Sequence, residues 1–480
     1  MPARYVCLSD LHLGAENSLL SNVAAGETAV DLNAPSPVLE ELIECLAALL
    51  DRLAGGPDGP KPTLVLNGDI LELALARDEV ALGVFTQFLE LAFEKHQLFD
   101  PKIVYLPGNH DHVLWGRDLD QSFADGGAPA SGSSGWSSLL FDANGSASGT
   151  RAGRTELLTS TIHRRTGLRH LEFELRYPTF AVESAQQESG TRVVAFHHGH
   201  FTEASSASIS ALRRAAFPRE MSSRTTWDHD DESSPWVEFV WSTLARPGAF
   251  GADVGVVHAM IQDPRGARVV AANLADAVGN VLPNWMPPQL RRTAGRVLLS
   301  RVAKKVADDE RSSPTAPLSN NSGDGLRDFL NGPLWHQLRV IEGHDDPTEL
   351  VFVFGHTHKP FADTLRYAGY GSPIARYNTG GWVVDSLRPL PGHGGAVLLF
   401  DEELRAANVE VFRRHGSANV VSVHSASSEH EAFGAQVRAA LEADAPMWSS
   451  LCSTIDHETP HRYRSLRAMI AEGLALAGSR

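Results

Sequence analysis

The chain has 480 residues, of which 42% are hydrophobic and 21% are charged, and its formal net charge is −16. This composition is ordinary for a globular protein and excludes collagen-like, fully disordered and disulfide-rich chains. The length predicts either several domains or one catalytic domain that carries large insertions. Because an acidic protein repels the phosphate backbone, the net charge disfavours a nucleic-acid partner.

The three cysteines, Cys7, Cys45 and Cys452, are too few for a disulfide framework. We expect them to be small, buried hydrophobic side chains. Residues 1–10 have no charged leader before a long apolar stretch, and we find no apolar run that could span a bilayer. The sequence therefore predicts a cytoplasmic protein, or one that binds peripherally to a membrane face reached from the cytoplasm.

Five short apolar runs are each followed by polar residues. Each run is rich in β-formers and four to six residues long, so we predict five buried strands. They are residues 4–8, 63–66, 102–106, 192–196 and 350–354. Amphipathic helical patterns at 37–53 and 79–96 separate the first three, and this alternation predicts an α/β layered domain. Ligands bind beyond the carboxyl ends of strands in such sheets, so the polar residues there are expected to form one site.

Two long segments interrupt this pattern. Residues 121–154 are rich in Gly, Ser and Ala and indicate a mobile loop. Residues 201–345 are mostly helical in pattern, and we interpret them as an inserted cap over the site. The predicted cap helices are residues 236–244, 267–278, 288–306 and 326–341.

The core is therefore expected in two parts, residues 1–200 and residues 346–480. In the second part, short strands are expected to form a second sheet, and two helices follow them. The strands are predicted at 350–354, 375–377, 382–385, 396–400 and 409–412, and the helices at 429–443 and 463–477.

The first candidate metal donors follow the first two strands. Asp10 and His12 form D-x-H, in which a carboxylate oxygen and an imidazole nitrogen could converge on one cation. Asp69 follows Gly68, and its two oxygens could bridge two cations. Each pattern alone is weak, because D-x-H often combines a capping Asp with a surface His, and Gly-Asp is a common turn.

The tetrapeptide Gly108-Asn109-His110-Asp111 is more specific. The Asn109 carbonyl is a hard oxygen donor without charge, which suits a second metal. His110 could protonate a leaving alkoxide or stabilise charge on phosphorus. Asp111 could orient that imidazole through its other nitrogen.

The remaining candidates are histidines. Of His197 and His198, only one is expected to face the site, because neighbouring strand residues point to opposite faces; a hydrogen-bonded structural histidine is the alternative. His356 and His358 form Gly-His-Thr-His, whose spacing in an extended segment points both imidazoles the same way. Such a pair suits Mn, Fe, Zn or Ni.

Together these clusters supply seven donors, enough for two cations with open positions for water and substrate. The series D-x-H, G-D, G-N-H-D, H and G-H-x-H resembles the five-block signature of the calcineurin-like metallophosphoesterases. The resemblance implies a four-layer α/β (α+β) sandwich, with two mixed β-sheets flanked by helices. It also implies a first metal held by Asp10, His12 and His358, a bridging Asp69, a second metal held by Asn109, His198 and His356, and a catalytic His110 with Asp111 as its partner.

Residues 10–14, 198–200, 355–360 and 378–382 also resemble the branch of UDP-2,3-diacylglucosamine pyrophosphatases. This chain departs from that branch at His110, where the branch usually has Arg, and at His200, where it has Asp. The resemblance covers the catalytic core and does not extend to the predicted cap.

We therefore expect a metal-dependent hydrolase that cleaves a phosphate ester or phosphoanhydride with metal-activated water. The expected cofactors are two divalent metal ions, with Mn favoured. The negative charge favours a phosphorylated small-molecule or lipid-linked substrate over nucleic acid. A protein phosphatase or nuclease of the same fold, and a non-catalytic scaffold, remain as alternatives.

Residues 288–306 combine six basic side chains with an apolar helical stripe. Such a helix could contact an anionic membrane peripherally or grip an anionic substrate. The plainer interpretation is a cap helix with a solvated basic face.

Overall fold

The computed structural model describes residues 1–24, 27, 29–56, 58–117, 156–184, 191–200, 265–266, 269, 316–341, 347–387, 390–413 and 418–478. The loop expected at 121–154 and the basic segment at 288–306 lie outside these residues. So does most of the expected cap, of which mainly residues 316–341 are described.

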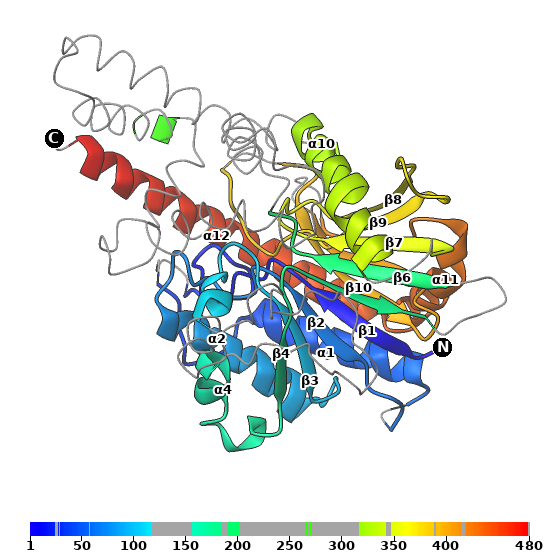
Figure 1. The fold of residues 1–480 in the computed structure, drawn as a ribbon. Helices are drawn as coiled ribbons and strands as arrows, with labels where there is room; N and C mark the ends of the chain where they lie inside the picture. Colours follow the sequence, from blue (N-terminus) through cyan, green and yellow to red (C-terminus); the bar gives the residue numbers. More distant parts are fainter. Residues whose placement is uncertain are drawn as a thin grey trace, which may run out of the picture.

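The described residues form two mixed β-sheets (Figure 1). The seven-stranded sheet has the order β12 (Ser422–His424), β11 (Ala406–Arg413), β10 (Gly394–Asp401), β1 (Ala3–Leu8), β2 (Thr63–Asn67), β3 (Lys102–Leu106) and β4 (Glu172–Leu175). The five-stranded sheet has the order β5 (Thr179–Glu183), β6 (Arg192–His197), β7 (Glu349–Phe354), β9 (Ile374–Asn378) and β8 (Phe361–Leu365). Strands β1 to β4 are parallel, as are β6, β7 and β9, so their carboxyl ends share one edge of each sheet.

The helices lie outside the two sheets (Figure 1). On the side of the seven-stranded sheet these are α1 (Pro37–Ala54), α2 (Asp78–Leu89), η1 (Glu90–Lys95), α4 (Glu156–Ile162), η2 (Thr166–Leu168), α11 (Ser428–Ala443) and α12 (Ala445–Gly478). On the side of the five-stranded sheet these are α10 (Asn320–Phe329), η5 (Leu330–Leu334) and η6 (Gln337–Ile341). Helix α1 begins at Pro37, whose fixed φ suits a first turn, and is capped by Gly55 at a φ of 81°.

Alternating strand residues divide the core into layers. Leu64 of β2 shares a hydrophobic cluster with Leu46 of α1, whereas the next residue, Val65, faces Val194 of β6 in a cluster between the sheets. Beyond the five-stranded sheet, Phe352 packs in a cluster with helix α10. The expected fold, two mixed sheets flanked by helices in four layers, is confirmed.

Several finer expectations differ from the structure. Strands β10 and β11 belong to the first sheet and not to the second, because β10 pairs antiparallel with β1. An apolar strand pattern reports burial and does not reveal which sheet the strand joins. Residues 382–385 form no strand; Val383 makes only an isolated bridge with Ser18. Helix α12 begins well before residue 463 and continues through Pro460, which normally indicates a helix boundary.

The three cysteines are buried and free, as expected. Among the residues that the structure describes, no helix is both long enough and apolar enough to cross a bilayer.

Candidate metal centre

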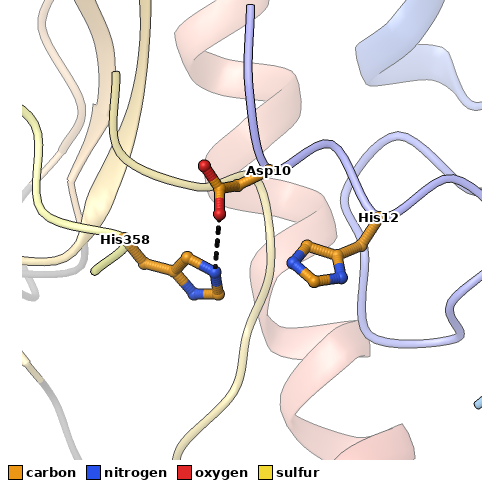
Figure 2. A group of neighbouring side chains, drawn as sticks. All are labelled: Asp10, His12 and His358. Atoms are coloured by element: carbon orange, nitrogen blue, oxygen red, sulfur yellow. Dashed lines mark ion pairs between the residues drawn. The ribbon is translucent and has the colours of Figure 1, made fainter. Parts of the chain in front are cut away.

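The first group of donors comes from two distant loops. Asp10 and His12 follow β1, and His358 follows β7. Figure 2 shows the three side chains directed toward a common space, and His358 Nε2 lies 3.4 Å from Asp10 Oδ1. One ligand atom from each residue lies within 4.8 Å of the others, so the group could hold a metal ion.

A second group lies beside the first. His198 Nε2 is 3.2 Å from Asp69 Oδ2, 3.1 Å from Asn109 Oδ1 and 3.3 Å from His356 Nδ1. Asp69, His198 and His356 again offer ligand atoms within 4.8 Å of one another. Nitrogen and oxygen donors this close, all buried or half-buried, could hold a metal ion.

Asp69 links the two groups. His12 Nε2 lies 3.9 Å from Asp69 Oδ2, and His12, Asp69 and His110 form a further group with ligand atoms within 4.8 Å. The ring centroids of His12 and His110 are 4.7 Å apart. Asp69 therefore lies between the two groups and contacts members of both.

The environment of His12 Nε2 indicates whether this space suits a cation. His12 Nδ1 lies 2.9 Å from Glu72 Oε2, and if the neutral ring donates there, Nε2 presents a lone pair toward Asp69. His12 Nε2 is buried and makes no hydrogen bond. A buried polar atom without a partner costs about 1–3 kcal/mol, and a cation between Nε2 and the carboxylate would remove that cost. The donor set fits a divalent metal.

Backbone strain concentrates at the same place. Asp10, His12, Asp69, His356 and His358 have positive φ angles of 50°, 45°, 51°, 65° and 55°. Elsewhere in the described part of the chain, only Gln97 and Leu404 among non-glycine residues do so. A left-handed residue other than glycine costs about 1–2 kcal/mol, and such strain clusters at functional sites.

Two motif glycines make room for donors. A Cβ atom at Gly355 would clash with Asp10 Oδ2, and one at Gly108 would clash with Asp69 Oδ1. The backbone at His356 also binds Asp10, because its N–H donates to both carboxylate oxygens at 2.9 and 3.0 Å. The Gly-His-Thr-His loop thus fits against Asp10 through both shape and hydrogen bonds.

The structure gives His110 a partner that the sequence reasoning missed. His110 Nδ1 lies 2.8 Å from Glu72 Oε1, while the other oxygen of Glu72 faces His12. Glu72 is buried and lies three residues after Asp69 in the same loop. Its position was the available sequence signal, because a carboxylate three residues after a predicted ligand, on the same loop, is a candidate for the same site.

Asp111, which the sequence reasoning paired with His110, is placed differently. Its Oδ2 accepts hydrogen bonds from Ile70 N at 2.9 Å and from the Tyr105 hydroxyl at 2.6 Å, and its Oδ1 accepts from Gly108 N at 2.6 Å. Asp111 therefore ties the loop after β2 to the loop after β3, and the carboxylate at the His110 ring is Glu72.

Of His197, the last residue of β6, and His198, which follows it, only one faces the site, as expected. His198 lies among the donors described above. The ring of His197 points to the other face, with its centroid 5.1 Å from that of Phe329 in α10. Its Nδ1 accepts a hydrogen bond from Gly199 N at 2.8 Å.

The buried carboxylates and imidazoles perturb one another. Burial disfavours the charged form of His198, but Asp69 and Asp10 outweigh burial and raise its pKa to about 9. Asp10 and Asp385 likewise outweigh burial and raise the pKa of His358 to about 10. Burial alone would raise the pKa of Asp69, yet His198 and His110 hold that pKa well below its ordinary value. Asp69 is therefore ionised and attracts cations.

No family model matches the chain, and a search of curated proteins finds no match. The chemical interpretation of the site therefore depends on its own geometry. Buried Asp and His groups that meet at the carboxyl edges of two sheets could hold a metal ion.

Proposed function

We propose that this protein is a metal-dependent phosphoesterase that hydrolyses a phosphate ester or phosphoanhydride with two divalent cations, Mn favoured. One observation carries the proposal: seven donors from five separate loops converge in two adjacent groups, and Asp69 of the second group lies 3.9 Å from His12 of the first. The left-handed backbone at five of these donors supports it, because a scaffold without function has no reason to retain that strain.

The seven donors divide between two cation positions. Asp10, His12 and His358 would hold the first cation, Asn109, His198 and His356 the second, and Asp69 both. Bound divalent cations supply Lewis acidity, which activates water near neutral pH and neutralises charge on phosphoryl oxygens. The protein holds these donors close together in a largely buried environment, where electrostatic interactions are strong.

His110 is the candidate general acid. In the metal-free protein, Glu72 and Asp69 outweigh burial and raise the pKa of His110 to about 9, so its ring carries a proton at neutral pH. Because Nδ1 faces Glu72, Nε2 is the ring atom that would pass a proton to the leaving oxygen. General acid catalysis contributes about 10²–10⁴-fold to rate, which sets the loss expected on removing the ring.

The substrate class follows from charge. With a net charge of −16, the protein repels a polyanion, which favours a phosphorylated small-molecule or lipid-linked substrate. Two cations neutralise negative charge only in their immediate surroundings. The site therefore suits a substrate with one phosphate group better than one with a long phosphate backbone.

The test uses the full chain loaded with Mn and a panel of p-nitrophenyl phosphate, bis-p-nitrophenyl phosphate, a nucleotide-sugar pyrophosphate, a phosphopeptide and single-stranded DNA. We expect hydrolysis of at least one small phosphate compound and a strong loss of turnover in Asp69→Asn. The matched control is Asp401→Asn, a buried carboxylate of β10 that pairs with Arg405. Asp401 lies opposite Ala3, at the end of β1 distant from Asp10.

Three results would contradict the proposal. Near-normal turnover in Mn-loaded Asp69→Asn would reject the assignment of Asp69. Absence of all hydrolysis by a chain with two bound metals would favour the scaffold. Preference for the phosphopeptide or DNA would replace the substrate class by one of the alternatives.

A further inference from the structure

A second carboxylate lies against His358, on the side of the ring away from Asp10. His358 Nδ1 is 3.0 Å from Asp385 Oδ2, whereas His358 Nε2 is 3.4 Å from Asp10 Oδ1. Each nitrogen of this imidazole therefore faces a different carboxylate. The side chains of His358 and Asp385 are 15% and 18% exposed, so both lie in the half-buried wall of the site.

We propose that Asp385 is a positioning residue that holds His358 with Nε2 directed at the first cation position. A histidine that binds a metal usually donates its other ring N–H to a carboxylate, a carbonyl or water, and this bond fixes the tautomer and the ring orientation. By accepting the Nδ1 proton, Asp385 leaves the Nε2 lone pair for the metal. This inference rests on the proposed function of the site.

The segment that carries Asp385 is fixed to the loop that carries Asp10. Trp382 N donates to Asp10 O at 3.0 Å, and Val384 N donates to Asn17 O at 2.9 Å. In return Asn17 Nδ2 donates to Val384 O at 3.1 Å. Asp385 is thus held in place relative to the first metal position by backbone bonds, although it belongs to no strand.

Helix α12 reinforces this arrangement from outside. Val384 is fully buried and clusters with Leu466 and Ile470 of α12. On the same helix, Arg462 is fully buried and donates to Ser18 O at 2.7 Å and to Ser21 O at 2.6 Å. The helix therefore anchors both the segment before Asp385 and the loop that follows His12.

His393 gives Asp385 a second neighbour. His393 Nδ1 lies 3.7 Å from Asp385 Oδ2, and His358, Asp385 and His393 have ligand atoms within 4.8 Å of one another. The same three residues would suit a third cation. The two interpretations differ in the number of metals bound, because a positioning residue changes affinity and leaves the stoichiometry unchanged.

The test measures metal binding and not only activity. Metal-free wild type, Asp385→Asn, Asp385→Ala and Asp385→Glu are titrated with Mn and Zn by calorimetry and by chelator competition. We expect two metals per chain in every variant, with one of the two bound about 10–100-fold more weakly in Asp385→Ala, and partial recovery in Asp385→Glu.

Glu349→Gln is the matched control. Glu349 Oε1 lies 3.0 Å from Nε2 of the fully buried His430, a second carboxylate–histidine pair that lies outside the metal site. We expect this variant to lower thermal stability and to retain the wild-type metal affinity. An equal loss of affinity in Glu349→Gln would show that general destabilisation explains the result and would overturn the inference.

Three further outcomes separate this inference from the proposed function. If wild type binds two metals and Asp385→Ala binds them as tightly, the inference fails and the proposed function stands. Loss of one of three bound metals in Asp385→Ala would replace the positioning role with a third cation site. If wild type binds no metal, the proposed function fails, and the inference fails with it.

Discussion

The Nδ1 atom of His110 lies 2.8 Å from the Oε1 atom of Glu72, and both side chains are buried. Glu72 Oε2 also lies 2.9 Å from His12 Nδ1, so one carboxylate contacts a candidate general acid and a candidate metal ligand. Burial alone would raise the pKa of Glu72, but the His110 and His12 imidazoles outweigh burial and hold it below its ordinary value. Glu72 therefore remains ionised and orients both rings.

Glu72→Gln should lower kcat almost as much as His110→Ala, by about 10²–10⁴-fold at saturating metal. The amide cannot hold the imidazolium as the carboxylate does, so His110 loses its orientation and its proton. The two losses should not add in the double variant, because both remove the same function. Steady-state kinetics on the four proteins tests this, and fully additive losses would show that Glu72 acts independently of His110.

The variant Asp111→Asn should lose stability and retain more turnover than Glu72→Gln. The Asp111 carboxylate accepts hydrogen bonds from two loops and from Tyr105, so we expect a loss of stability of about 1–3 kcal/mol for a buried group left without its partner. Turnover of the folded, metal-loaded variant should stay closer to wild type than that of Glu72→Gln. A kcat loss equal to that of His110→Ala without any loss of stability would restore Asp111 as the partner of His110.

Metal affinity should rise with pH. In the metal-free protein the pKa values of His198 and His358 are raised to about 9 and about 10, so both rings are protonated at neutral pH. A metal binds the neutral imidazole and must displace these protons, so apparent affinity should increase by about tenfold per pH unit for each proton displaced until pH passes those pKa values.

Calorimetric titrations with Mn at pH 6, 7 and 8 in buffers of different ionisation enthalpy measure this proton release. We expect at least one proton released per chain at pH 7. Binding that is independent of pH, with no dependence on the buffer, would show that the rings are already neutral.

Gly355→Ala should abolish metal binding at the first position and lower turnover strongly. The added Cβ would clash with Asp10 Oδ2 and with Ser9 Oγ, so the Asp10 carboxylate must move. Gly323→Ala in α10 is the control, because a Cβ there has no neighbour within 4 Å, and alanine favours a helix by about 1 kcal/mol. Metal titration and thermal unfolding separate the two, and unchanged metal binding in Gly355→Ala would contradict the steric argument.

The sequence predicted the strands that carry the donors most accurately. Strand β3 occupies the expected residues 102–106, and β1, β2, β6 and β7 differ from expectation by one residue at an end. These strands are parallel and buried on both faces, so each is a continuous apolar run that ends abruptly in polar residues. Because ligands bind beyond the carboxyl ends of strands in such sheets, the position of the donors at strand ends predicted that they would form one site.

The strands and site residues that the sequence did not predict have no distinctive local sequence pattern. Edge strand β8 has only half-buried or exposed residues, and edge strand β5 is five residues long with a polar residue at each end. Each pairs antiparallel with a strand near it in the sequence, β9 and β6 respectively. Glu72 and Asp385 are single carboxylates whose roles arise only from folding, when each comes to lie against a histidine ring. Asp111 stands next to His110 in the sequence, yet adjacent side chains in a turn need not point the same way.

The central position of β1 has a consequence for how the chain is made. This strand lies between β2, which follows soon after it, and β10, which begins at Gly394. At translation rates of about 5–20 residues per second, β1 waits about 20–80 seconds on the ribosome before its second neighbour is synthesised. During that interval one edge of β1 is exposed to chaperones and to other nascent chains, and the first cation position cannot form until His358 has emerged.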